Sequence, residues 1–211
     1  MMQAMEVIDL NKDFGRAVLR AAGVLRSGGV IVYPTDTLYG LGADAFSDAA
    51  AAKVYAIKAR DPLKPIHCVV ADMEMAAHYA ELNDAARRIA EKFLPGPLTL
   101  ILRKKPGLSD GIARGIDTMG IRIPKNEFCL ELAKSFGKPY TATSANIAGM
   151  TSERSLEKIS TQLGERGAGI DLWVDAGELP ESAPSTIVNL VSGFPSIIRE
   201  GAIPAPNILS A

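Results

Sequence analysis

The sequence has few aromatic residues, few cysteines and almost no net charge. Aromatic side chains make up 6% of its 211 residues, which argues against a protein that binds single-stranded nucleic acid by stacking bases. Lysine and arginine number 23 and aspartate and glutamate 24, so the formal net charge at pH 7 is −1. A uniformly basic nucleic-acid-binding protein is therefore not expected, although a local basic patch is compatible with this balance.

The two cysteines, Cys68 and Cys129, are far apart and belong to no CxxC motif or Cys/His cluster. Two cysteines cannot build a disulfide framework, and a zinc site needs more ligands at close spacing. Sparse cysteines are typical of a reducing compartment, where they serve as small buried hydrophobic residues. We therefore expect no metal site built from protein side chains.

No apolar run approaches the roughly 20 residues that a membrane-spanning helix requires. The N-terminal sequence MMQAMEVIDLNKDF also lacks the basic and then apolar order of a secretory signal. These absences predict a cytoplasmic protein with no membrane partner. Hydrophobic residues account for 47% of the chain and charged residues for 22%, which is an ordinary globular composition. The length suits a single domain, which we expect to comprise residues 1–211.

Short predicted strands alternate with predicted helices along most of the sequence. Apolar residues at helical spacing predict helices at 13–26, 48–59, 73–93 with a break near Asn83, 127–136, and from Ser152 or Ser155 to about 163. Apolar runs predict strands at 30–33, 66–71, 98–103, 118–123, 139–143, 170–174, 185–191 and 196–199. The alternation indicates an α/β fold. The crowding of strands near the C-terminus favours a mixed parallel and antiparallel sheet over a purely parallel one.

The first stretch with unusual chemistry is PTDTLYGLG at 34–42, directly after a predicted strand. Its threonines and tyrosine supply hydroxyl groups, and its glycines let the backbone approach a ligand closely. In open α/β sheets, ligands bind beyond the carboxyl ends of strands, where this stretch would lie. A polar turn between a strand and a helix explains the pattern equally well. No GxxxxGK[ST] motif is present, which argues against P-loop nucleotide binding.

Cationic residues gather at the end of the second predicted helix, where Lys58 and Arg60 are followed by Lys64. Cations are favoured at a helix C-terminus by the helix dipole, and in isolation this structural explanation is sufficient. The alternative is a phosphate clamp, because arginine presents a planar fork and lysine a point charge. Pro62 and Pro65 would stiffen the loop that carries them.

Small polar residues recur at other predicted strand ends, in Thr118–Arg122, TATSAN at 141–146, ST at 185–186 and REG at 199–201. Each is compatible with an ordinary turn. The two histidines, His67 and His78, lie in no Ser/His/Asp or HExxH pattern, and neither cysteine has a recognisable general base nearby. The remaining hydroxyls, amides and cations suit the positioning and charge stabilisation of phosphates better than nucleophilic or acid–base catalysis.

Taken together, these stretches resemble the YrdC-type family of threonylcarbamoyl-AMP synthases. The similarity runs from about Gly28 to Gly201. Its landmarks, in order, are PTDTLYGLG at 34–42, K-x-R at 58–60, KP at 64–65, PGPLT at 95–99, T-x-x-x-R-x-P at 118–124, SAN at 144–146, ST at 185–186 and REG at 199–201. No single landmark is specific, but the whole series in this order is. Because about ten residues follow Gly201, the chain looks like the short, single-domain form.

The resemblance implies an enzyme that converts L-threonine, bicarbonate and ATP into threonylcarbamoyl-AMP and pyrophosphate. Other tRNA-modification proteins would then transfer the threonylcarbamoyl group to an adenosine of tRNA. The implied fold is a twisted mixed sheet with surrounding helices and one concave, basic face. The implied cofactor is Mg²⁺, held mainly through ATP.

By the matched positions, the resemblance also implies which residues form the site. Lys58 and Arg60 would stabilise charge on the reacting phosphates and act as catalytic residues. Threonine would be held by Thr35, Thr37, Arg122, Ala142 and Ser185. ATP would be held by Arg60, Lys64, Thr118, Ser144, Asn146, Ser152 and Arg199.

Two positions depart from the pattern of the family. Some relatives have asparagine where Lys64 stands, so the polar function is kept and a charge is added. Some also have a ligand-contacting histidine at the position of Val69 rather than at His67. His67 is therefore expected to fill the core or a loop and is only a weak site candidate.

Two other functions stay open at this point. The concave face could hold tRNA or double-stranded RNA without catalysis, and any such binding should be weak because the net charge is −1. A different carbamoyl or adenylyl transfer, as in maturation factors that use carbamoyl phosphate, is the second alternative. Those larger proteins usually carry cysteine-rich and acyl-phosphatase modules, which this chain lacks. ATP consumption that requires both threonine and bicarbonate distinguishes the enzyme from the RNA-binding module.

Overall fold

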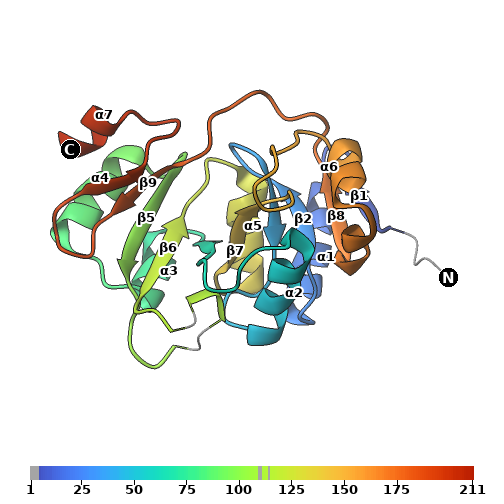
Figure 1. Ribbon diagram of the computed structural model, residues 1–211, viewed down its shortest axis with the longest axis horizontal. Coiled ribbons are helices and arrows are strands. Elements are labelled where there is room, and N and C mark those ends of the chain that lie inside the picture. The colour runs from blue at the N-terminus through green and yellow to red at the C-terminus, as the bar shows by residue number, and fades with distance from the viewer. Residues whose placement is uncertain (1–4, 109–110, 114) are drawn as a thin grey trace.

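The computed structural model describes residues 5–108, 111–113 and 115–211 and contains a ten-stranded mixed sheet (Figure 1). The strand order is β1-β8-β2-β3-β7-β4-β6-β5-β9-β10. The strands are β1 (Val7–Asp9), β2 (Ile31–Pro34), β3 (Tyr39–Gly42), β4 (His67–Val69), β5 (Leu98–Arg103), β6 (Thr118–Arg122), β7 (Tyr140–Ser144), β8 (Leu172–Asp175), β9 (Thr186–Asn189) and β10 (Ser196–Arg199).

Both kinds of strand pairing occur in this sheet. The pairs β1–β8, β2–β8, β4–β6 and β5–β9 are parallel. The pairs β2–β3, β3–β7, β4–β7, β5–β6 and β9–β10 are antiparallel. The mixed sheet with surrounding helices that the sequence predicts is thus confirmed, and the concave basic face stays a prediction.

The α-helices are α1 (Phe14–Arg26), α2 (Asp48–Lys58), α3 (Met73–Tyr79), α4 (Asp84–Phe93), α5 (Glu127–Phe136), α6 (Leu156–Leu163) and α7 (Ala205–Leu209), with 3-10 turns η1 (Gly111–Ala113) and η2 (Gly164–Gly169). Helices α1 to α6 each begin after an aspartate, serine or asparagine whose side chain accepts a backbone N–H of the first turn. Such caps satisfy donors that a helix leaves unpaired, which explains why their starts can be read from sequence. No described helix combines the length and apolar composition that crossing a membrane requires.

The helices divide between the two faces of the sheet. Helices α2, α3, α4, α6 and α7 pack on one face through a large apolar cluster that reaches from β8 to β9. Helices α1 and α5 pack on the other face, over apolar residues of β1, β2, β4, β7 and β8. Figure 1 shows β9 and α7 at one end of the molecule and β1 and β8 at the other. The cavity described below lies on the α1/α5 face, beside the part that these helices cover.

The structure differs from the sequence-based prediction at three elements. Strand β1 and helix α7 were not predicted, and the second half of PTDTLYGLG is strand β3 rather than a loop. Pro34 pairs with Tyr39, so that residues 35–38 form a hairpin turn between β2 and β3. Tyr39 and Leu41 bury their side chains in the apolar cluster beneath α2, which is the alternation expected of a strand. The polar loop is thereby shorter and more ordered than the sequence suggests.

Candidate active site

A cavity of about 170 Å³ lies where the β2–β3 turn, β4, β6 and β7 meet the segments before β9 and at the end of β10. Its wall includes most of the predicted site residues, which come from distant parts of the chain. These are Thr35, Thr37, Arg60, Arg122, Ala142, Ser144, Ser185 and Arg199. Hydroxyl groups and three guanidinium groups therefore line one cavity, as the resemblance to the synthases implies.

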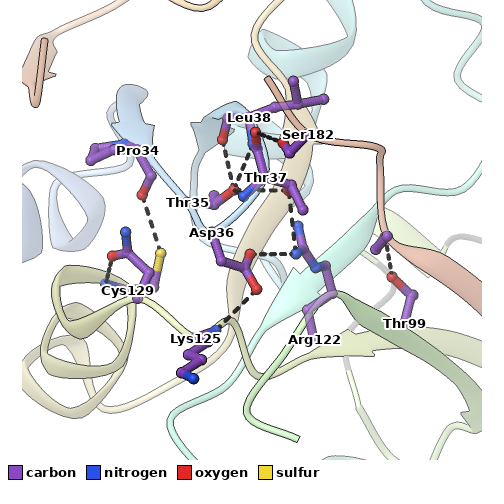
Figure 2. A network of polar contacts seen from close by, with 12 residues as sticks. Pro34, Thr35, Asp36, Thr37, Leu38, Thr99, Arg122, Lys125, Cys129 and Ser182 are labelled. Atoms are coloured by element: carbon purple, nitrogen blue, oxygen red, sulfur yellow. Dashed lines mark hydrogen bonds and ion pairs between the residues drawn. The ribbon is translucent and has the colours of Figure 1, made fainter. Parts of the chain in front are cut away.

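Arg122 stands at the end of β6 and forms a buried ion pair with Asp36 of the β2–β3 turn (Figure 2). Nη2 of Arg122 lies 2.7 Å from Oδ1 of Asp36 and 3.5 Å from Oγ1 of Thr37. The other carboxylate oxygen of Asp36 accepts the backbone N–H of Lys125 at 3.0 Å. Nε of Arg122 is buried and has no hydrogen-bond partner within the described residues. A buried donor without a partner is costly, so the position of Arg122 carries an energetic cost that its ion pair with Asp36 offsets only in part.

The β2–β3 turn is held by the side chain of Thr35 (Figure 2). Its Oγ1 accepts the backbone N–H groups of Thr37 and Leu38, both at 3.1 Å, and donates to the carbonyl oxygen of Leu38 at 2.7 Å. Ser182 reinforces the turn by donating to the carbonyl oxygen of Thr37 at 2.6 Å. The hydroxyl of Thr35 is thus used within the turn, and that of Thr37 is the better placed to contact a ligand.

Arg199 and Ser185 bring the C-terminal part of the chain to the cavity. Nε and Nη2 of Arg199 donate to the carbonyl oxygen of Ser185 at 3.2 and 2.7 Å. The hydroxyl of Ser185 lies 2.9 Å from Oγ1 of Thr99 on β5. Burial, and then the positive charge of Arg122, lower the pKa of Arg199. The two guanidinium groups therefore lie close enough to repel each other, and an anionic ligand would relieve this repulsion.

Steric crowding explains why the REG motif ends in a glycine, Gly201. A Cβ atom at Gly201 would lie 2.1 Å from the carbonyl oxygen of Pro184, which is far closer than packed atoms approach. The backbone N–H of Gly201 also donates to Oγ1 of Thr186 at 3.0 Å. The segment after β10 can therefore pack directly on Pro184 and Ser185, and it supports the part of the wall that they form.

The position of Arg60 depends on the backbone conformation at the end of α2. Ala59, the C-cap of α2, has a left-handed backbone with φ of 49°, and the N–H of Arg60 donates to the carbonyl oxygen of Tyr55 at 3.0 Å. The guanidinium of Arg60 donates to the carbonyl oxygens of Lys64 at 3.3 Å and Pro65 at 3.1 Å. Left-handed backbone is unfavourable for a residue with a Cβ atom, so this strain accompanies the placement of Arg60.

Lys58, predicted to stabilise the phosphates, lies outside the cavity lining. Its side chain is 2% exposed, and its ammonium donates to the carbonyl oxygen of Ser144 and to the carbonyl and side-chain oxygens of Asn146, the latter two at 2.9 and 2.8 Å. Burial, and then the charge of Arg60, lower the pKa of Lys58 to about 7. An ammonium group has three donors, and all three are used here. Lys58 therefore holds the SAN segment in place, and its contact with the phosphates stays a prediction.

Several other predicted contacts also lie outside the cavity wall. Asn146 is buried, where its amide group donates to the carbonyl oxygen of Met150 at 2.6 Å. The side chain of Lys64 is exposed, and its carbonyl group alone contacts Arg60. Thr118 begins β6, at the opposite end from Arg122, and Ser152 lies in the connection between β7 and α6.

The cavity wall contains His67, which the sequence suggested to be core or loop filler. The strand register places His67 opposite Ala142 of β7, another residue of the wall, so its side chain borders the cavity. Val69 is two residues further and so on the same face of β4, but it packs in the α1/α5 cluster. Burial and then the charges of three arginines lower the pKa of His67 to about 4. A lone histidine in an apolar run carries no sequence signal of such a position.

Comparisons with known proteins find relatives that match most of the chain. The Sua5/YciO/YrdC family model, described as telomere recombination, matches residues 23–201. A putative threonylcarbamoyl-AMP synthase of Methanocaldococcus jannaschii is 39% identical over 201 residues, which are 95% of this chain and 93% of that protein. The threonylcarbamoyl-AMP synthase of Bacillus subtilis is 35% identical over 88% of this chain and 54% of its own length. The chain thus spans about half of this longer relative.

Solved structures are similar over nearly the whole chain. Sua5 of P. abyssi in complex with L-threonine has a TM-score of 0.84 and 32% identity, over 92% of this chain and 56% of that one. YciO of E. coli has a TM-score of 0.83 and 26% identity, over 99% of this chain and 100% of that one.

Proposed function

Because the chain belongs to the Sua5/YciO/YrdC family, we propose that it is a threonylcarbamoyl-AMP synthase. It takes L-threonine, bicarbonate and ATP and releases threonylcarbamoyl-AMP and pyrophosphate, which makes it a nucleotidyltransferase. The product is a reactive mixed anhydride, so other tRNA-modification proteins would take over its threonylcarbamoyl group. The names of the relatives and the threonine complex of P. abyssi Sua5 support this proposal.

The observation that carries the proposal is the convergence of Arg60, Arg122 and Arg199 on one cavity. Guanidinium groups bind carboxylates and phosphates through paired, charge-assisted hydrogen bonds. Both kinds of anion occur in this reaction, since threonine carries a carboxylate and ATP a triphosphate. Arg122 is the most buried of the three, which suits the smaller substrate.

We assign the threonine site to the part of the cavity around Arg122. The guanidinium charge of Arg122 would attract the carboxylate, and the hydroxyls of Thr37 and Ser185 would contact the polar groups of the substrate. Thr35 would act by holding the turn that carries Thr37. Ala142, on β7, would contribute through its backbone.

We assign the triphosphate of ATP to Arg60, Arg199 and Ser144. Thr118 and Arg122 are four residues apart on β6, so their side chains lie on the same face, about 13 Å apart along the strand. ATP that extends from the cavity along this face would come close to Thr118. Lys64 and Ser152 stay proposed contacts at its periphery.

The proposed chemistry requires no nucleophile from the protein. The amine of threonine and bicarbonate first form a carbamate with loss of water. An oxygen of this carbamate group then attacks the α-phosphate of ATP, and the bond between the α-phosphate and pyrophosphate breaks. Negative charge then grows on the phosphate oxygens, where Arg60 and Arg199 would stabilise it. Two further groups, Lys58 and Asn146, would act by holding the SAN segment in place.

Magnesium is proposed as a cofactor that binds through ATP. Within the described residues there is no group of three or more acidic, histidine or cysteine side chains that could hold a metal ion. Asp36, the carboxylate next to the cavity, already bonds Arg122 and the N–H of Lys125. The described residues thus fit poorly a magnesium ion held by the protein alone. Triphosphate oxygens are its preferred ligands in many ATP sites, where the ion neutralises part of the phosphate charge.

Pyrophosphate release tests the proposal. The purified protein is incubated with Mg-ATP alone, with threonine or bicarbonate singly, and with both together. The proposal expects pyrophosphate only when threonine and bicarbonate are both present. ATP turnover that is indifferent to either compound would contradict it and would point to a different adenylyl transfer.

A further inference from the structure

The side chain of His67 lies in the cavity wall, in space that is open because residue 120 is a glycine. The residue lies on β4 between β7 and β6, and the β4–β6 register places it beside Gly120. A Cβ atom at Gly120 would lie 2.3 Å from Cδ2 and 2.9 Å from Cγ of His67. The imidazole therefore rests directly on the backbone of Gly120, and any side chain there would displace the ring.

The imidazole is free to bind a ligand. Its ring nitrogens have no hydrogen-bond partner in the described part of the chain. Unlike Nε of Arg122, which is fully buried and has no partner, the ring nitrogens of His67 are not fully buried. The ring nitrogens therefore face the open space of the cavity.

The cavity keeps this imidazole neutral. Burial, and then the positive charges of Arg122, Arg199 and Arg60, hold the pKa of His67 at about 4. A neutral imidazole has one N–H donor and one nitrogen lone pair, whereas guanidinium groups only donate. His67 thus offers an acceptor in a wall where the charged groups are mostly donors.

The other strong acceptors near the cavity are already engaged. Both carboxylate oxygens of Asp36 are bonded, to Arg122 and to the N–H of Lys125. The hydroxyl of Tyr39 donates to the carbonyl oxygen of Gly177 and accepts the N–H of Ala176. The free lone pair of His67 is therefore the strongest uncommitted acceptor among these groups.

We propose that His67 binds the amino group of threonine by accepting a hydrogen bond at its unprotonated ring nitrogen. This inference rests on the proposed function. Threonine presents a carboxylate, which arginines attract, and an ammonium group, which they repel. A neutral acceptor in the same wall as Arg122 and Ala142 can accept a hydrogen bond from the ammonium group without repelling it. His67 thereby makes the site selective for substrates with an amino group.

Calorimetric binding of two ligands tests this role. One is L-threonine, and the other is (R)-3-hydroxybutyrate, which is threonine without its amino group. His67→Leu should weaken threonine binding by about 10-fold or more, the loss expected when a hydrogen bond to a charged group is removed. The affinity for (R)-3-hydroxybutyrate should change by less than about 2-fold. His78→Leu is the matched control, because His78 is exposed on α3 and lies outside the cavity lining.

The outcomes separate this inference from the proposed function. Equal weakening of both ligands would show that His67 only shapes the cavity, and unchanged threonine binding would show that it has no role; either result overturns the inference alone. A wild-type protein that does not bind threonine would contradict the proposed function and the inference together. Binding is measured without turnover, so the result does not depend on catalysis.

A second variant keeps the test valid if His67→Leu folds poorly. Gly120→Ala keeps the histidine but displaces its ring, so it should also weaken threonine binding selectively. In the His67→Ala background the ring is absent, and adding Gly120→Ala should then cost little further affinity. Losses that simply add in the double variant would overturn the contact between the two residues.

Discussion

Nη2 of Arg122 and Oδ1 of Asp36 form an ion pair of 2.7 Å in which both side chains are about nine-tenths buried, at 9% and 8% exposure. The pair turns the guanidinium so that Nη2 is engaged while Nε has no partner in the described residues. Asp36 in turn is fixed through the N–H of Lys125. Asp36 lies between Thr35 and Thr37. It therefore orients Arg122, the arginine that we assign to the carboxylate of the substrate.

Removing Asp36 should weaken both folding and threonine binding. Asp36→Ala leaves the charge of Arg122 buried without a partner, a change that typically lowers the free energy of unfolding by roughly 3–5 kcal/mol. Glu131→Ala breaks the exposed pair with Lys134 and is the matched control, with an expected loss of at most about 1 kcal/mol. Urea unfolding and threonine calorimetry measure the two effects. A loss no larger than that of the control, with unchanged threonine affinity, would contradict the orienting role.

Arg60→Ala should remain folded and lose most of its activity. The side chain makes two hydrogen bonds to loop carbonyls, so its removal should shift the melting temperature by only a few degrees. Loss of a group that stabilises transition-state charge typically costs about 100-fold or more in rate. Arg60→Lys keeps the charge without the planar fork and should recover only part of the activity. Circular-dichroism melts and pyrophosphate release are measured on the same preparations.

Arg166→Ala is the matched control for Arg60. Arg166 also donates to a carbonyl oxygen of α2, that of Ala56, and it lies outside the cavity lining. Its removal should leave pyrophosphate release unchanged. A folded Arg60→Ala protein with the turnover of this control would mean that Arg60 only decorates the end of α2.

The helices could largely be predicted from sequence because their signals are local. Ser47 and Asn83 cap α2 and α4 through hydrogen bonds to residues three positions ahead. Strand β1 has no such signal: it is three residues long, and its pairing with β8 joins residues far apart in the chain. Only that distant partner makes Val7–Asp9 a strand.

The sequence predicted several residues of the cavity wall but not the geometry of the cavity. The motifs indicated Thr37, Arg122 and Ser185, and the structure brings all three to one cavity. Sequence could not show that Lys58 turns its ammonium toward Asn146, because that depends on how α2 packs beside the end of β7. It also could not show that His67 faces the cavity, because a strand residue's face is set by the register with its neighbours.

Lys58 and Asn146 should behave as one unit. Lys58→Met removes three hydrogen bonds and leaves buried oxygens without a donor, each at a cost of about 1–3 kcal/mol, so a large loss of stability is expected. Asn146→Ala should produce a similar defect in pyrophosphate release, and the double variant should be little worse than either single one. Kinetics at a temperature where all variants are folded provide the comparison. Effects on turnover that add fully would indicate separate roles and a direct contact of Lys58 with ATP.

Stability should depend on pH through His67. Its pKa is about 4 in the folded protein and near 6.5 when unperturbed, so between these values the unfolded chain binds more protons. The free energy of unfolding should therefore rise with pH across this window, by up to about 1.4 kcal/mol per pH unit, relative to His67→Gln. Urea unfolding of both proteins at about pH 5, 6 and 7.5 measures the difference. A difference that is constant over this range would contradict a neutral, buried imidazole.

The most direct test of the account is to detect its product. The wild-type protein is incubated with L-threonine, ¹³C-labelled bicarbonate and Mg-ATP, and the mixture is analysed at once by mass spectrometry, since the mixed anhydride decays in water. The account predicts threonylcarbamoyl-AMP that carries one ¹³C atom, and its absence when threonine is omitted. ATP cleavage without this labelled species, or no reaction in a protein shown to be folded, would contradict the account.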